Sequence, residues 1–139
     1  MSSFKIFDIA GSGMSAQSVR LNTVASNLAN ADSVSGDPNN VYRAKHPVFQ
    51  AVLGSGLNAD ASTATVTVSG IAENPAAPAS RYDPGNPLAD SQGYVYAPNV
   101  NIVEEMTDMI SASRSYQNNV EVMNTARDLM LDTLKLGQS

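Results

Sequence analysis

Proline is confined to the middle of this chain, and that confinement limits where long helices can form. The 139 residues contain seven prolines, and all of them fall between Pro38 and Pro98. A proline inside a helix removes a backbone hydrogen bond and clashes with the preceding turn. Long helices are therefore expected only in the two proline-free ends of the chain.

The first helix is expected from about Phe4 to Asn30. Alternating steps of three and four residues along this stretch meet an apolar side chain at six of seven positions. This spacing is the a/d pattern of a helix that packs along a coiled-coil seam. The predicted seam consists of Phe7, Ala10, Met14, Gln17, Leu21, Val24 and Leu28.

The second helix is expected from about Ile102 to Leu136, and the same steps meet eight apolar or aromatic side chains in ten positions. Asn101 followed by Glu104 suits a capping box at its start. Glu105 adds negative charge where the helix dipole favours it. The predicted seam consists of Ile102, Met106, Met109, Ser113, Tyr116, Val120, Met123, Arg127, Met130 and Leu134.

Two such stripes fit an ordinary pair of amphipathic helices in a bundle, but the apolar surface is wider than one contact needs. Several apolar residues of the second helix lie off its seam, and charged residues make up only 15% of the chain. A helix that is apolar on more than one side requires further neighbours. We therefore expect other copies, or similar proteins, to cover these off-seam residues: Ile110, Ala112, Val122, Ala126 and Leu129.

The region between the helices is expected to be rich in turns and strands. Thr63–Gly70 alternates like a strand, and Tyr42–Leu53 contains another that Pro47 places at an edge or splits. The fold class is thus α+β, with residues 1–30 and 101–139 as a helical inner domain and residues 31–100 as a β-rich insertion. The remaining expectations are a loop at Glu73–Ser80, a turn at Asp83–Pro87 and extended chain at Gly93–Val100.

Composition excludes several classes of function. The net charge is −5 and the basic residues are scattered singly, so the chain has no electrostatic footprint for nucleic acid. Cysteine is absent, which removes disulfides, thiol catalysis and thiolate metal sites and suits a protein that leaves the cytosol. No apolar run is long enough for membrane insertion. Asp8 interrupts the place where a cleaved secretion signal would have its apolar core.

The candidate chemical motifs have structural explanations. Gly11, Gly13 and Ala16 match a dinucleotide-binding pattern, but that pattern needs a preceding strand, and this stretch is predicted as helix. The glycines instead indicate close backbone approach or a kink. His46 is the only histidine and stands in a predicted loop. We expect no catalytic, cofactor-binding or metal-binding residues, and no enzymatic activity.

Four blocks of sequence resemble a known family. They are Ile6–Ser33, which contains "SNLAN", followed by Tyr42–Phe49, Tyr82–Met106 and Ser111–Gln138. Together they resemble the axial-protein family of the bacterial flagellum, and within it the proximal-rod proteins of the FlgC type. The short middle region and the "DPGNPLAD" turn favour the proximal-rod type over the longer distal-rod type.

This resemblance implies a structural role without cofactors. The terminal helices would pair into a coiled-coil domain lining a hollow rod that crosses the periplasm and transmits torque from motor to hook and filament. The implied partners are other proximal-rod and distal-rod proteins, and the protein that joins the rod base to the MS ring. Export would use the flagellar type III apparatus without a cleaved signal. A non-polymerising adaptor or export-linked binding module is the alternative.

The two seams and the "SNLAN" stretch supply the residues expected to mediate assembly. Asn27 is expected to bond the backbone of a neighbouring subunit, so that its loss would weaken assembly and leave the monomer unharmed. Asn30 is expected to cap the first helix in the left-handed conformation. The full set is Phe7, Met14, Leu21, Val24, Asn27, Leu28, Asn30, Ile102, Met106, Met109, Tyr116, Val120, Met123, Met130 and Leu134.

Overall fold

The fold was taken from a computed structural model, which describes residues 3–53 and 64–137. It contains two long helices and four strands, which confirms the α+β class. In chain order, the elements are α1 (Ser3–Ala29), β1 (Lys45–Leu53), β2 (Ala64–Glu73), β3 (Ala79–Tyr82), β4 (Tyr94–Ala97) and α2 (Ile102–Leu136).

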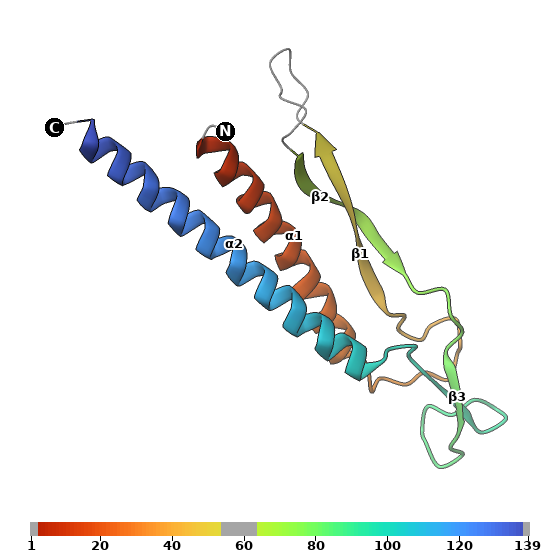
Figure 1. The fold of residues 1–139 in the computed structure, drawn as a ribbon. Helices are drawn as coiled ribbons and strands as arrows, with labels where there is room; N and C mark the ends of the chain where they lie inside the picture. The colour runs from red at the N-terminus through yellow and green to blue at the C-terminus, as the bar shows by residue number, and fades with distance from the viewer. Residues whose placement is uncertain (1–2, 54–63, 138–139) are drawn as a thin grey trace.

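Helix α1 lies in the middle of an elongated molecule (Figure 1). Helix α2 packs antiparallel along one side of it, and the β1–β2 hairpin packs along the other side. The small β3–β4 sheet lies at the end where α1 finishes and α2 begins. The start of α1 and the end of α2 consequently lie at the opposite end of the molecule, and α1 is the element that joins the helical layer to the β layer.

The helix ends follow from local capping. The Asn101 side chain accepts hydrogen bonds from the backbone N–H groups of Val103, at 3.1 Å, and Glu104, at 3.4 Å. Asn101 therefore is the N-cap of α2, as predicted, and α2 spans the predicted residues. The reciprocal bond of a capping box, from the Glu104 side chain, is not present among the hydrogen bonds of the described residues.

Small side chains are prominent among the buried residues of α1 and α2. Ala10, Ala16, Ala112 and Ala126 are among the most buried residues of the chain. A Cβ atom at Gly13 would lie only 2.9 Å from Nδ2 of Asn119. The expected close backbone approach is thus confirmed at Gly13, and α1 continues as an α-helix through both glycines.

The predicted α2 seam is wrong in part. The residues of α2 that face α1 recur every seven positions, at Glu105, Ala112, Asn119 and Ala126. Hydrophobicity alone favoured the large side chains beside this row, whereas close packing admits alanine and hydrogen-bonded polar groups. Five predicted seam residues are exposed instead, namely Arg127 and the four large residues Ile102 (44%), Met106 (55%), Tyr116 (38%) and Leu134 (63%). Met123 of the predicted seam does lie against α1, at Gly11.

The β1–β2 hairpin is antiparallel and irregular. Lys45 pairs with Glu73 and Leu53 with Ala64, and the register shifts between Val48 and Phe49. Pro47 lies within β1, and because a two-stranded sheet has only edge strands, its predicted edge position is confirmed.

The second sheet was partly missed. Strands β3 and β4 pair in antiparallel fashion, and Ser35 adds an isolated bridge to Tyr96 on the other side of β4. The predicted loop at Glu73–Ser80 is wrong at both ends, because Glu73 completes β2 and Ala79 begins β3. The segment Gly93–Val100, predicted as extended chain, contains β4. The turn predicted at Asp83–Pro87 is closed by a hydrogen bond from Asn86 N to Asp83 O at 3.1 Å.

The two glycines of α1 predict different responses to alanine. Gly11→Ala should raise the free energy of unfolding by about 0.5–1 kcal/mol through helix propensity, because the nearest atom to the new Cβ is Met123 Cε at 3.9 Å. Gly13→Ala should give no such gain, because Asn119 would have to move and give up its bond to Ser115 O. Urea denaturation of both variants checks this. Equal stabilisation would show that the close approach at Gly13 is absent.

Candidate functional site

Asn27 occupies the centre of the most connected polar cluster in the described residues. Its Nδ2 donates to Lys45 O at 2.8 Å and to Glu105 Oε1 at 2.9 Å. Its Oδ1 accepts from the Tyr42 hydroxyl and from Lys45 N, each at 2.9 Å. Both donors and both acceptor positions of the amide are therefore used. The side chain is fully buried, with an exposed fraction of 0%.

The cluster joins three parts of the chain that are distant in sequence. Asn27 lies in the last turn of α1, Lys45 begins β1, and Glu105 lies in the first turn of α2. The paired bonds to the N–H and C=O groups of Lys45 have the form of the bonds that an adjacent strand would make. Asn27 thereby fixes where the hairpin and α2 start relative to the end of α1.

Glu105 brings a buried carboxylate into this cluster. Its exposed fraction is 4%, and its Oε2 atom has no hydrogen-bond partner within the described residues. The N-terminal turn of α2 favours its negative charge. Burial, and then the charges of Glu105 and Glu73, raises the pKa of Tyr42 above its ordinary value. The neutral Tyr42 hydroxyl is thus the form that the cluster holds.

A second polar contact crosses the helix pair near Asn27. The Arg20 guanidinium donates to Asp108 Oδ1 at 2.8 Å, and both side chains are partly exposed. Such a pair contributes little to stability, on the order of 1 kcal/mol or less. Its orientation requires the α2 face that contains Asp108 to lie against α1, which supports the revised seam.

The structure corrects the expectations for two asparagines. Asn27 bonds groups of its own chain, so its amide has no capacity left for a neighbouring subunit. Asn30 is not in the left-handed conformation, since no non-glycine residue of the described chain has a positive φ. It terminates α1 differently, by donating from Nδ2 to Ser26 O at 2.8 Å. Sequence reasoning could not find the Tyr42 and Lys45 partners of Asn27 because it did not place residues 42–45 beside α1.

The other residues expected to mediate assembly fall into two groups. On α1, Val24 is buried, and the remaining four, Phe7, Met14, Leu21 and Leu28, are half-buried. On α2 the exposed residues have been given above, and the half-buried ones are Met109, Val120, Met123 and Met130.

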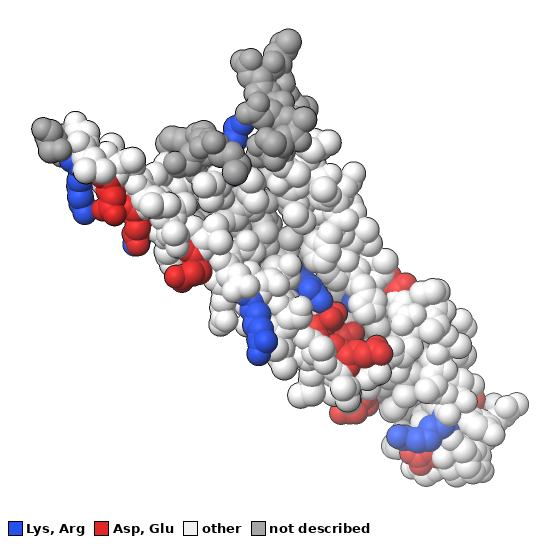
Figure 2. Space-filling model, in the orientation of Figure 1, with Lys and Arg blue, Asp and Glu red and all other residues white. Residues whose placement is uncertain are grey.

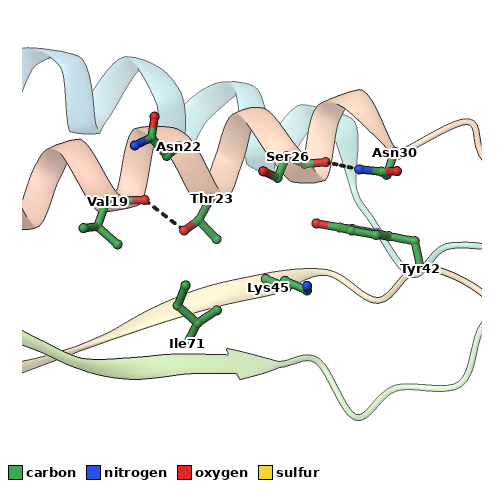
Figure 3. A pocket seen from close by; sticks show the side chains of 8 residues that line it. All are labelled: Val19, Asn22, Thr23, Ser26, Asn30, Tyr42, Lys45 and Ile71. Atoms are coloured by element: carbon green, nitrogen blue, oxygen red, sulfur yellow. Dashed lines mark hydrogen bonds between the residues drawn. The ribbon is translucent and has the colours of Figure 1, made fainter.

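The described part of the chain contains pockets between its elements. A pocket of about 390 Å³ lies between α1 and the hairpin (Figure 3). Two of its polar side chains, Thr23 and Asn30, bond carbonyl groups of their own helix. No group of three or more histidine, aspartate or glutamate residues that could hold a metal occurs in the described part of the chain. Neither of the two described helices is apolar enough over a sufficient length to cross a membrane.

The surface charge is unevenly distributed. On the face shown in Figure 2, charged side chains follow α2 and gather near its N-terminal end. The upper part of the hairpin on this face carries almost no charge. Large uncharged areas of this kind can be buried against neighbours without the desolvation cost of ions.

Comparison with known protein families gives two matches. Residues 7–36 match the family described as flagella basal body rod protein. Residues 91–136 match the family described as flagellar basal body rod FlgEFG protein C-terminal. The first match covers most of α1, and the second covers β4 and α2.

Full-length relatives agree with both matches. The chain is 55% identical to the flagellar basal-body rod protein FlgC of Escherichia coli O6:H1, over 99% of this chain and 100% of the relative. It is 56% identical to the protein of the same name from Yersinia enterocolitica, with the same coverage. A third relative with this name, from Aquifex aeolicus, is 44% identical over 97% of both chains.

The cluster predicts that Asn27 supports the fold of the single chain. Asn27→Ala should lower the free energy of unfolding by about 2–4 kcal/mol, because Lys45 and the buried Glu105 carboxylate lose their partners. Asn22→Ala is the matched control, since Asn22 is exposed on the same helix. Thermal or urea denaturation measures both variants. An unchanged stability for Asn27→Ala would contradict the role given to the cluster.

The raised pKa of Tyr42 predicts a loss of stability in alkali. An unfolded tyrosine ionises near pH 10, and the folded Tyr42 ionises later. Its contribution is therefore complete below about pH 10 and disappears as the pH rises through the folded pKa. Wild type should lose more unfolding free energy above pH 10 than Tyr42→Phe does, as measured by denaturation at a series of pH values. Parallel curves would argue against a buried Tyr42 hydroxyl.

Proposed function

Because this chain belongs to the FlgC family of flagellar basal-body rod proteins and is a structural subunit of the rod, we propose that it polymerises through its terminal helices into the hollow proximal rod. In this role the chain forms part of the drive shaft that transmits torque from the motor to the hook and filament. The rod crosses the periplasm, and the subunit performs no enzymatic reaction.

An exposed apolar stripe on α2, on a side that does not face α1, is the observation that carries this proposal. Val103, Met106 and Ile110 follow the heptad spacing and are exposed by 72%, 55% and 57%. The row that faces α1 begins at Glu105 and continues through Ala112, which places the stripe on the opposite side of the helix. A monomer would leave this stripe in water, whereas neighbouring helices in a tube would cover it.

The last turns of α2 support the same conclusion. Leu129, Leu134 and Leu136 are exposed by 64%, 63% and 75%. Leu129 also lines an apolar pocket of about 240 Å³, together with Ile6 and Val122. Helix α2 thus offers uncovered apolar groups along its full length, as a subunit with neighbours on several sides requires.

The proposed partners are other proximal-rod and distal-rod proteins, and the protein that connects the rod base to the MS ring. The subunit reaches them through the flagellar type III export apparatus, without a cleaved signal peptide. We propose that the subunits assemble head to tail, because contacts of one surface with a different surface generate open helical arrays. The residues proposed to make these contacts are the exposed α2 residues Ile102, Met106, Tyr116 and Leu134, together with the stripe.

The stripe gives the experimental test. Ile110→Ser should leave the stability of the chain within about 0.5 kcal/mol of wild type, because the side chain is exposed. It should sharply reduce the number of complete basal bodies recovered from cells that depend on this variant. Ser111→Ala, at the adjacent exposed position, is the control and should assemble normally. Normal rods with Ile110→Ser would refute the role of the stripe, and a stable one-to-one complex with a partner would favour an adaptor.

A further inference from the structure

The twist of the β1–β2 hairpin gives each strand one edge segment near α1 and one that faces away. Near Lys45, β1 lies between α1 and β2, as Figures 1 and 3 both show. Near Leu53 the order is reversed, and β2 lies between α1 and β1 (Figure 1). Two edge segments are therefore turned away from the helices. One is the upper edge of β1, at residues 49–53, and the other is the lower edge of β2, at residues 71–73.

Two side chains of α1 occupy the edges that face it. Asn27 bonds both backbone groups of Lys45 on β1, as described above. On β2, Val66 N donates to Ser12 Oγ at 3.1 Å, while Ser12 donates to Ile9 O at 2.8 Å. Unpaired strand edges are templates for pairing with another chain. Helix α1 thus closes one segment of each edge within the subunit.

These bonds also establish which backbone groups point outward. Val66 pairs with Ala51, and since Val66 N bonds outside the ladder, this pair is a non-hydrogen-bonded one. The N–H and C=O groups of Ala51 therefore point away from β2, and by alternation so do those of Phe49 and Leu53.

The same rule applies to the lower half of the hairpin. Lys45 directs both backbone groups to Asn27, so its partner Glu73 directs its own groups outward on the far edge of β2. Ile71 shares this orientation, because it lies two residues from Glu73 and pairs with Pro47. The hairpin therefore has two outward edges, on different strands and at opposite ends.

The upper edge of β1 lacks the features that normally prevent strand pairing. Residues 49–53 read "FQAVL", with no charge and no proline. Phe49 and Leu53 are exposed by 41% and 64%, and no described residue hydrogen-bonds the outward backbone groups of this segment. Proteins usually protect such edges with charges, prolines or cover. Pro47 protects β1 only in its lower half.

We propose that the edge of β1 at Phe49–Leu53 accepts an added strand from a second copy of this chain, supplied by that copy's outward edge at Ile71–Glu73. Pairing different edges of two copies is head-to-tail and leaves a free edge at each end, which permits an open array. Pairing β1 with β1 would close a dimer and stop growth. Main-chain bonds of this kind give affinity without requiring charged side chains. The inference rests on the proposed role as a rod subunit.

Proline at position 51 tests the edge directly. Ala51→Pro removes the outward N–H and leaves the bonds to β2 in place, as Pro47 does in the native strand. Ala51→Thr keeps the N–H group and is the matched control. The number of complete basal bodies recovered from cells should fall about tenfold for Ala51→Pro, because each contact loses a backbone hydrogen bond. The number should stay at the wild-type level for Ala51→Thr. Undiminished assembly of Ala51→Pro would overturn the proposal.

Cross-linking identifies the occupant and remains informative if the proline variant misfolds. Because the chain has no cysteine, cells can produce an Ala51→Cys copy together with an Ala72→Cys copy. A short thiol cross-linker applied to isolated basal bodies should join these two copies. Ser80→Cys, on β3, replaces Ala72→Cys in the control and should give no product with Ala51→Cys.

The outcomes separate this inference from the proposed function. If cells that lack the chain still build rods, the role as a rod subunit fails. If rods require the chain but position 51 cross-links to a different protein, or to position 51 of another copy, the rod role stands and the proposed occupant is wrong.

Discussion

The structure depends on the four hydrogen bonds of one buried amide. Asn27 presents two donors and two acceptor positions in a compact planar group, and each of them meets a group from the start of β1, from the preceding loop or from α2. Leucine at this position would fill the same space and leave the Lys45 peptide groups and the Glu105 carboxylate without partners. A residue that weakens a helix by its propensity is therefore retained where three segments must meet in one register.

The features that sequence reasoning predicted well are those that local chemistry determines. Asn101 caps α2 through its nearest neighbours, and proline excludes helix from the middle of the chain. Strands β1 and β2 were anticipated from their short stretches of sequence, and β4 lies in a segment that was predicted only as extended chain. Strand β3 was not, because its four residues are all exposed and show no alternation of burial.

Sequence reasoning could not predict how closely remote segments of the chain, such as α1 and α2, pack against each other. Which row of α2 packs against α1 depends on how closely α1 approaches. The alternatives are the predicted row of large apolar side chains and the row of Glu105, Ala112, Asn119 and Ala126. That approach depends in turn on Gly13 and on the Asn27 cluster. Hydrophobic periodicity measures how apolar each face is, and α2 is apolar on two faces. The face that contains Val103, Met106 and Ile110 remains exposed in the single chain, so the error in the predicted seam itself points to neighbours.

The contact between Gly13 and Asn119 has a mechanical consequence. Asn119 lies in a notch that exists only because Gly13 has no side chain, and its Nδ2 is held by Ser115 O at 2.9 Å. Sliding α2 along α1 by one turn, about 5.4 Å, would bring Met123 or Tyr116 to the notch in place of Asn119. Neither side chain has the size or the bond that suits it. The notch thus resists axial shear between the helices, so that under twisting load the pair deforms as a single beam.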